Sequence, residues 1–387
     1  MESNYKRLGN FIREVDIRNG ELNYKKLKGV NLQKELIDSV ANVIDVDFSS
    51  YKVVKKNQFV CKLMSVGRDK RLPISLNEDD EPIIISSAYY CFENLDENLI
   101  LTEYLKLCLF RPIFEKELWF ISGRDVRGGI TWNDFCNVEI PVPSIEEQEK
   151  IVRQYKIVEK RKTLLNKLNT QLLVTLDLLY NKNFGFFKDD IKNLTDDGYK
   201  KIELPKKWKI MKMQNKFNIS IGRTPPREEL EYFSYDSSDL DWYSIADMKE
   251  NCVYIDSATE KLTKKALDEF KIRVIPEGSI LLSFKMTVGR VSITDKNAFT
   301  NEAIANFNVD DNWRYYLFLY LRNFDFKCLG STSSISTSIN SKIVKSLPFI
   351  EPDELTIKDF NKKVMPIFDC IKTIQKEYDV LSTINFL

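Results

Sequence analysis

The sequence predicts an α+β protein in which two mixed α/β domains are separated by two long helices that form an antiparallel coiled coil. Three observations predict this organisation. Apolar residues recur at the three- and four-residue spacing of a coiled-coil seam after Ser144 and again after Pro352. Similar strings precede the two seams, "EIPVPSIEEQEKIV" and "SLPFIEPDELTIKDF". The segments before these strings mix strand-like and helical runs.

The first long helix is expected to begin at Ser144. Ser144 and Glu147 have the S-x-x-E spacing of a capping box, in which each side chain accepts a hydrogen bond from the other residue's backbone N–H. Polar Lys162 and Asn169 stand at two positions of the seam, and no Gly or Pro interrupts it before "NKNFGFF". The apolar seam positions are Ile151, Tyr155, Val158, Leu165, Leu172, Leu176 and Leu179.

The second seam is unbroken, although Pro366 lies inside it and is expected to kink the helix or loosen its first turns. Its apolar positions are Ile357, Phe360, Val364, Ile367, Ile371, Ile374, Tyr378 and Leu381. Either helix alone is more typical of an ordinary core helix. The matched pair favours packing of the two stripes on each other, in antiparallel orientation.

The two halves therefore form an internal repeat with a period of roughly 205 residues. The expected parts are a first domain at 1–143, a first helix at 144–182, a polar linker at 183–207, a second domain at 208–350 and a second helix at 351–387. Strand-like runs such as "YKVVKK", "PIIISSAYYCF", "GSILLSF" and "GRVSITD" alternate with helical runs such as "NLILTEYLKLCLF", "LTKKALDEF" and "WRYYLFLYLRNF".

Composition argues against a self-sufficient enzyme. The 387 residues include no histidine, so the usual general base and the commonest zinc ligand are both missing. No phosphate-binding loop or dinucleotide-binding turn occurs, so we expect no cofactor. We also expect no membrane span, because no long apolar run is free of charges. Seven scattered cysteines without a C-x-x-C pair are typical of reduced thiols, which predicts a cytoplasmic protein.

A nucleic-acid partner has to be recognised locally, because 58 basic residues face 57 acidic ones and the net charge is only +1. Five residues between 52 and 71 are candidates for contacts with phosphates, although a solvated strand and loop surface explains them equally well. These residues are Lys52, Lys55, Lys56, Arg68 and Arg71.

Two glycine-flanked turns carry arginines that can reach a guanine edge or clamp a phosphate. The first, "SGRDVRGG", contains Arg124 and Arg127, and the second, "GRTPPRE", contains Gly222, Arg223 and Arg227. Gly222 is expected to let its turn approach DNA. Structural turns are the alternative interpretation of both segments.

The residues resemble those of a known family, the specificity subunits of type I DNA restriction-modification systems. In the first half "YKRLGNFIREVDIRNG" and "RDVRGGITWNDFCNVEIPVPSIEEQEKIV" are similar to a target-recognition domain and its spacer helix. In the second half "WYSIADMK", "EGSILLSFKMTVGRVSI" and "TNEAIA" are similar to another variant of that domain. Asn301 belongs to the string "NEAI", which resembles a motif of this family.

The resemblance implies a non-catalytic subunit that reads a bipartite sequence in double-stranded DNA. It implies docking of two methyltransferase subunits and recruitment of a restriction and translocase subunit. S-adenosylmethionine, ATP and Mg would be bound by those partners. Because the two domains differ in sequence, we expect an asymmetric target. The alternative function is a coiled-coil scaffold with two protein-binding heads and no affinity for DNA.

Overall fold

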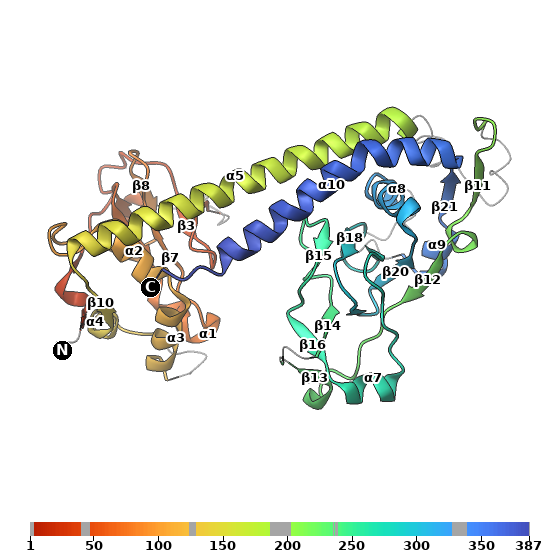
Figure 1. Cartoon of the computed structure of the whole chain (residues 1–387). Coiled ribbons are helices and arrows are strands. Elements are labelled where there is room, and N and C mark those ends of the chain that lie inside the picture. The colour runs from red at the N-terminus through yellow and green to blue at the C-terminus, as the bar shows by residue number, and fades with distance from the viewer. Residues whose placement is uncertain are drawn as a thin grey trace. The chain divides into compact units, whose positions relative to one another are not determined.

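The computed structural model describes residues 4–39, 47–123, 129–185, 203–234, 236, 239–326 and 339–386. They fall into two compact units. One unit is Met1–Lys160 with Ile384–Leu387, and the other is Arg161–Thr383. We call the elements from β1 to β10 the first head, and those from β11 to β21 the second head. In Figure 1 the first head is red to orange and the second is green to blue.

The first head is built on an antiparallel sheet with the strand order β2-β9-β6-β7. Its strands are β1 (Tyr5–Arg7), β2 (Ile12–Glu14), β3 (Lys28–Val30), β4 (Leu36–Asp38), β5 (Lys52–Val54), β6 (Gln58–Cys61), β7 (Ile74–Leu76), β8 (Ile83–Ile85), β9 (Tyr90–Asn94) and β10 (Glu139–Pro141). Its helices are α1 (Val66–Asp69), α2 (Thr102–Phe110), α3 (Pro112–Ile121) and α4 (Trp132–Asn137).

Aromatic rings join this sheet to the helices. The rings of Phe59 on β6 and Phe92 on β9 stack with centroids 5.0 Å apart. Phe135 of α4 packs edge-on against Phe92, and Phe114 of α3 packs edge-on against Phe135. All four side chains are buried, so one apolar core spans the sheet and the helices.

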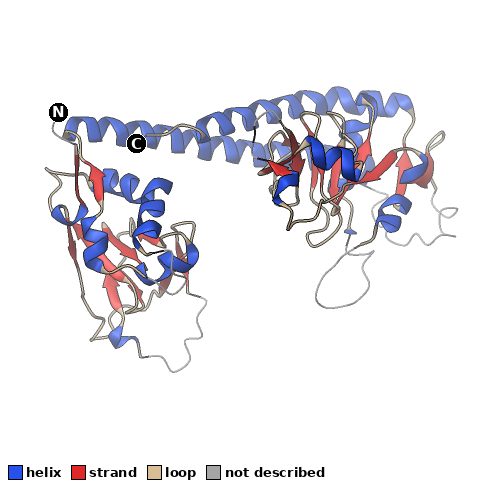
Figure 2. Cartoon of the chain, turned by 90° about the horizontal axis from the view of Figure 1, so that it is seen from below, coloured by secondary structure: helices blue, strands red, loops and turns tan. Residues whose placement is uncertain are grey.

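The second head contains two larger sheets, with the orders β12-β20-β17-β18-β15 and β13-β16-β14-β19. Its strands are β11 (Lys209–Lys212), β12 (Asn218–Ile221), β13 (Phe233–Ser234), β14 (Leu240–Tyr243), β15 (Tyr254–Ile255), β16 (Glu260–Leu262), β17 (Ile280–Ser283), β18 (Val291–Thr294), β19 (Phe299–Thr300), β20 (Ile304–Asn308) and β21 (Pro348–Glu351). Its helices are α7 (Lys264–Phe270), α8 (Asp311–Arg322) and α9 (Ser341–Ser346). Figure 2 shows both helices and strands in each head.

The two heads repeat one chain path, which confirms the internal repeat predicted from the sequence. In each head the first strand pairs antiparallel with the last, β1 with β10 and β11 with β21. The backbone N–H of Leu8 donates to the Val138 carbonyl at 2.8 Å, and that of Met213 donates to the Leu347 carbonyl at 2.9 Å. In both halves the last strand then leads directly into a long helix.

The two predicted long helices are present as α5 (Ile145–Phe184) and α10 (Glu354–Ser382). Within the second unit they run in opposite directions, because Arg161 pairs with Glu377 at 2.7 Å while the ring of Phe184 lies 4.9 Å from that of Phe360. Figure 1 shows them side by side and shows α10 changing direction partway along. Pro366 lies inside α10 and cannot donate a backbone hydrogen bond, which is the expected cause of such a bend.

The apolar face of α10 is shared between α5 and the second head. Phe368 stacks on Tyr315 of α8 with centroids 4.4 Å apart, and it belongs to the same buried core as Leu173 and Leu176 of α5. Ser144 accepts a hydrogen bond from the Glu147 backbone N–H at 3.3 Å, as expected at the start of α5. None of the helices in the described ranges combines the length and hydropathy needed to cross a bilayer.

Candidate nucleic-acid interface

Lys52, the first of the expected phosphate contacts, lies inside the first head. It is the first residue of β5, and its side chain is 6% exposed. Its ammonium group lies 3.7 Å from Asp16, 3.9 Å from Glu14 and 5.6 Å from the ring centroid of Tyr90. A hydrogen bond from Arg18, together with the charge of Lys52, lowers the pKa of Asp16, so this carboxylate is ionised at neutral pH. Lys52 therefore neutralises two acids, and its burial leaves little of its side chain accessible to a phosphate.

The other four residues of this group are exposed, but they are divided between two places. Lys55 and Lys56 form the turn before β6, whereas Arg68 and Arg71 follow it, and the four residues of β6 span about 13 Å. Lys56 pairs with Asp80 at 2.6 Å, and Arg68 holds Asp69 through two hydrogen bonds of 2.7 and 2.9 Å. Within the described ranges, Lys55 and Arg71 form no ion pair. These two are the best-placed cations of the group.

Arg124 and Arg127 lie outside the described residues, so the first arginine-bearing turn is not placed.

Gly222 has a packing role inside the second head. A Cβ atom at this position would lie 2.2 Å from the backbone carbonyl oxygens of Thr300 and Asn301. The N–H of Gly222 donates to Ile304 at 3.2 Å, and the N–H of Arg223 donates to Thr300 at 2.9 Å. The absence of a Cβ atom at this position is therefore required by the close contact of the end of β12 with the backbone of Thr300 and Asn301.

The side chains of Arg223 and Arg227 have different partners, although both residues lie on one turn. Arg223 is exposed, and its guanidinium donates to the carbonyl oxygen of Phe270, at the end of α7, at 2.8 Å. Arg227 pairs with Glu260 at 2.8 Å and lies over the rings of Phe233 and Trp242, 4.8 and 4.6 Å from their centroids. Arg227 therefore already has a carboxylate and two rings as partners, and Arg223 is the better candidate for contact with a ligand.

Asn301 shapes the turn between β19 and β20. Its backbone N–H donates to Tyr243 at 3.0 Å, and its side-chain oxygen accepts from the N–H of Ala303 at 3.1 Å. This turn supplies the carbonyl that packs on Gly222, so Asn301 supports the position of Arg223.

A cavity of about 250 Å³ opens beside Arg223, and every charged residue that lines it is cationic. The four cations come from three separate parts of the second head. They are Arg223 after β12, Lys271 and Arg273 after α7, and Lys345 on α9. Such a site favours an anionic group and is the strongest electrostatic candidate for contact with phosphates.

Lys271, Arg273 and Lys345 were not predicted from the sequence. The elements that bring them to Arg223, which are β12, α7 and α9, are far apart in the chain. For Lys271 and Arg273 a signal was present, because basic residues alternate with apolar ones in "FKIRV" after a helical run. Their proximity to Arg223 depends on how α7, β12 and α9 meet, which local sequence does not specify.

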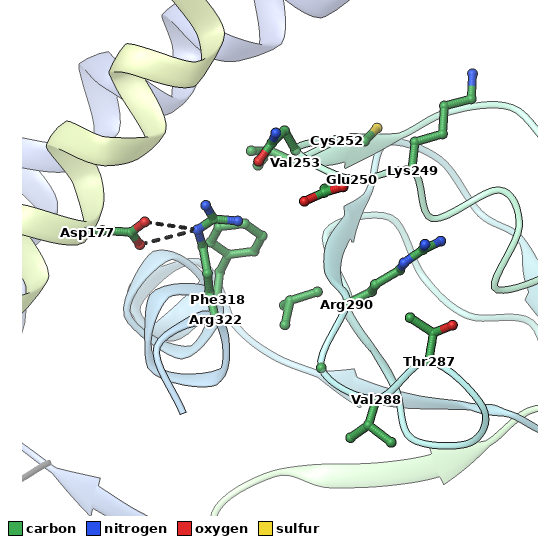
Figure 3. Close-up of a pocket in the computed structure, with 13 residues that line it drawn as sticks. Asp177, Lys249, Glu250, Cys252, Val253, Thr287, Val288, Arg290, Phe318 and Arg322 are labelled. Carbon is green, nitrogen blue, oxygen red and sulfur yellow. Dashed lines mark hydrogen bonds and ion pairs between the residues drawn. The ribbon is translucent and has the colours of Figure 1, made fainter. Parts of the chain in front are cut away.

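A second cavity, of about 490 Å³, lies where α5 meets the second head, beside α8 (Figure 3). Asp177 of α5 holds Arg322 of α8 at 3.2 Å, and Figure 3 shows this pair at the edge of the cavity. Arg290 donates to the backbone carbonyls of Ile245 and Met248, each at 3.1 Å. Because the carboxylates of Asp177 and Glu250 also line it, this cavity between α5 and the second head is less suited to an anion.

Comparison with known proteins decides the family. A family model described as the type I restriction modification DNA specificity domain matches residues 75–174 and 205–377, which include parts of both heads and both long helices. The chain belongs to this family. Each matched segment contains the last strand of a head, β10 or β21, and the first part of the long helix that follows it.

Curated members of the specificity-domain family are similar over different shares of the chain. The HindI specificity subunit of Haemophilus influenzae is 22% identical over 395 residues, covering 85% of this chain and 84% of that protein. The MjaIX specificity subunit of Methanocaldococcus jannaschii is 24% identical over 193 residues, covering 47% of this chain and 43% of that protein. A solved S subunit from M. genitalium is 12% identical, covers 98% of this chain and 92% of its own, and has a TM-score of 0.49.

Proposed function

We propose that this chain is the DNA-reading subunit of a type I restriction-modification complex and is not itself catalytic. The observation that carries the proposal is the match of the specificity-domain family to both halves of the chain. The relatives are named as specificity subunits of type I restriction enzymes, which extends to this chain the role of selecting a DNA sequence. We assign no cofactor to the chain and place S-adenosylmethionine, ATP and Mg on its partner subunits.

Double-stranded DNA is the proposed ligand of both heads. In the second head the four-cation cavity beside Arg223 supports a contact with phosphates. In the first head the exposed cations Lys55 and Arg71 are the proposed counterpart. Arginine is the better candidate for direct readout of bases, because its planar group can bond a guanine edge through two hydrogen bonds.

We propose that α5 and α10 separate the two half-sites that the heads read. The 40 residues of α5 correspond to about 60 Å at 1.5 Å per residue, compared with about 34 to 36 Å for one turn of B-DNA. A spacer of this length requires base pairs that neither head reads. The target is therefore bipartite.

The partners are proposed to be two methyltransferase subunits and a restriction and translocase subunit. Apolar side chains on α5 support docking of other chains, because they lie on the side of the helix opposite to its buried seam. They are Leu164, Leu168, Val174 and Leu178, which are between 41% and 65% exposed. A methyltransferase helix with an apolar face is the expected occupant.

The test is the affinity of the chain for duplex DNA, measured with its methyltransferase partner present at several salt concentrations. We expect the logarithm of the association constant to fall linearly with the logarithm of the salt concentration, and one sequence to bind far more tightly than random duplexes. Binding that depends on neither salt nor sequence would contradict the proposal and favour a protein-binding scaffold.

A further inference from the structure

We infer that the four-cation cavity of the second head is a seat for a single phosphate group of the DNA backbone. The inference rests on the proposed function and makes it specific to one place. It concerns Arg223, Lys271, Arg273 and Lys345, three of which are outside the basic segments that the sequence singled out. The charge, the floor and the size of the cavity all favour a phosphate.

The charge at the cavity is not neutralised from within the protein. Some exposed cations of the second head have carboxylate partners, as in the pairs Arg227–Glu260 and Lys265–Glu231, at 2.8 and 2.7 Å. Within the described part of the chain, by contrast, Lys271, Arg273 and Lys345 form no ion pair. Cations gathered around one cavity repel one another, so an anion placed among them is favoured.

The floor of the cavity supplies a hydrogen-bond donor at a fixed orientation. Asn306 of β20 and Thr300 of β19 line the cavity and are 3% and 1% exposed. The Thr300 hydroxyl donates to the side-chain oxygen of Asn306 at 3.0 Å. That bond engages the acceptor of the Asn306 carboxamide and leaves its NH₂ group as a donor for a ligand oxygen. An oxyanion surrounded by cations and met by an amide N–H is the chemistry that this site fits.

One wall of the cavity is held in place independently of any ligand. Arg223 donates through its guanidinium to Phe270 at 2.8 Å, which ties the end of β12 to the end of α7. Its backbone N–H is bonded to Thr300 at 2.9 Å, directly above the floor. Because Arg223 is positioned in the free protein, little ordering is needed when an anion binds.

Size and polarity exclude a larger ligand. The cavity of about 250 Å³ is smaller than pockets for drug-sized molecules, which hold about 300–1,000 Å³ and are lined mainly by apolar groups. Its lining is instead mostly charged and polar, with Asn218 and Ser220 of β12 beside the cations. A phosphate group fits this description, and it can come either from the DNA backbone or from free inorganic phosphate.

The experiment uses the whole chain with its methyltransferase partner present and a duplex of random sequence, and compares Arg273→Gln and Lys345→Gln with a matched control. The control is Lys264→Gln, which removes the same charge at the other end of α7, about 10 Å from Lys271. Each cavity variant is expected to reduce the salt slope by up to about 0.9, the contribution of one phosphate, and to reduce the affinity by up to roughly ten-fold at 0.1 M salt. Lys264→Gln is expected to retain the wild-type slope.

The outcomes separate the two proposals. If the wild-type chain shows no salt-dependent binding to duplex DNA, the proposed function itself fails. If the wild type binds but both cavity variants keep its slope, DNA reading stands and the phosphate seat is overturned. A second measurement compares the thermal melting of wild type and cavity variants with and without inorganic phosphate. Stabilisation by phosphate that both cavity variants lose, together with unchanged DNA slopes, would assign the cavity to free phosphate and contradict a backbone contact.

Discussion

Lys52 and Lys55 are three residues apart in the chain, and both precede β6, yet Lys52 is buried and Lys55 is exposed. The ammonium of Lys52 is enclosed by Glu14, Asp16 and Tyr90, whereas Lys55 is exposed at a turn. A buried cation that already neutralises two acids cannot turn to a phosphate without losing that interaction. The surroundings of a cation, and not its presence in a basic segment, decide whether DNA can use it.

Replacement of Lys52 is therefore expected to affect folding and not DNA binding. Lys52→Ala should lower the free energy of unfolding by about 2 kcal/mol, because it removes the apolar stem and leaves two carboxylates together. Lys52→Met keeps the stem and should lose less. Urea unfolding measures the stability of each variant. The salt slope of duplex binding measures its contact with DNA. A reduced slope in a stable Lys52→Met variant would restore Lys52 to the contact surface.

Gly222 permits a separate test of its structural role. In Gly222→Ala the new methyl group meets two backbone oxygens at 2.2 Å, so the end of β12 has to move and stability should fall by about 1–3 kcal/mol or more. Gly29→Ala is the matched control, since nothing lies within 4 Å of a Cβ atom there. The urea midpoints of the two variants are compared. If Gly222→Ala is as stable as wild type but binds DNA more weakly, the original interpretation of a close approach to DNA is correct.

At the residue scale the sequence displays charges but not their partners. It marked Arg223 as a candidate, and the structure places Arg223 beside a cationic cavity. It could not show that Arg227 forms an ion pair with Glu260, or that Lys345 lines the same cavity as Arg223. These residues are distant in sequence and meet only through the tertiary fold.

The long helices were the most predictable elements, because a seam repeated over many turns with no interrupting Gly has few other interpretations. The quoted strand-like and helical runs are confirmed in β5, β8, β9, β17, β18, α2, α7 and α8. The closing pairs β1–β10 and β11–β21 were not predicted, since each joins strands at opposite ends of a head. Register between such distant strands depends on the whole core between them.

The polar interruption of the α5 seam at Asn169 has a specific partner. Its side-chain NH₂ donates to the carbonyl of Asn251 at 3.0 Å, while its side-chain oxygen has no hydrogen-bond partner among the described atoms. On α10 the side-chain oxygen of Gln375 accepts from the N–H of Tyr254 at 3.1 Å. Both helices thus use a polar side chain to hold the segment that leads into β15.

Asn169→Leu is expected to loosen that segment while leaving overall stability within about 1 kcal/mol of wild type. The leucine extends the apolar seam, which offsets the hydrogen bond that the Asn251 carbonyl loses. Hydrogen exchange at residues 251–254 should become faster. Gln171→Leu, on the exposed side of α5, is the control and should leave exchange there unchanged. Equal protection in both variants would mean that Asn169 does not hold the segment.

At the scale of the whole molecule, the repeat is one of chain path and not of surface. Both heads close with an antiparallel strand pair that leads into a long helix. Between these strands the first head has a four-stranded sheet as its largest, whereas the second has sheets of five and four strands. Two scaffolds that share a plan but differ in sheets and side chains present different groups to DNA, so they are not expected to read the same bases.

The target is therefore expected to consist of two unlike short half-sites separated by unread base pairs. Methylated positions mapped in DNA from cells with and without the gene would reveal it. Arg223→Ala, in the second head, should relax discrimination in one half-site, by about 1–3 kcal/mol at a contacted base pair, and leave the other half unchanged. Arg71→Ala, in the first head, is the reciprocal variant and should act only on the opposite half, either on its base preference or on its affinity. A palindromic or continuous methylated sequence, or a loss of discrimination in both halves from one substitution, would contradict a division of the readout between two unlike heads.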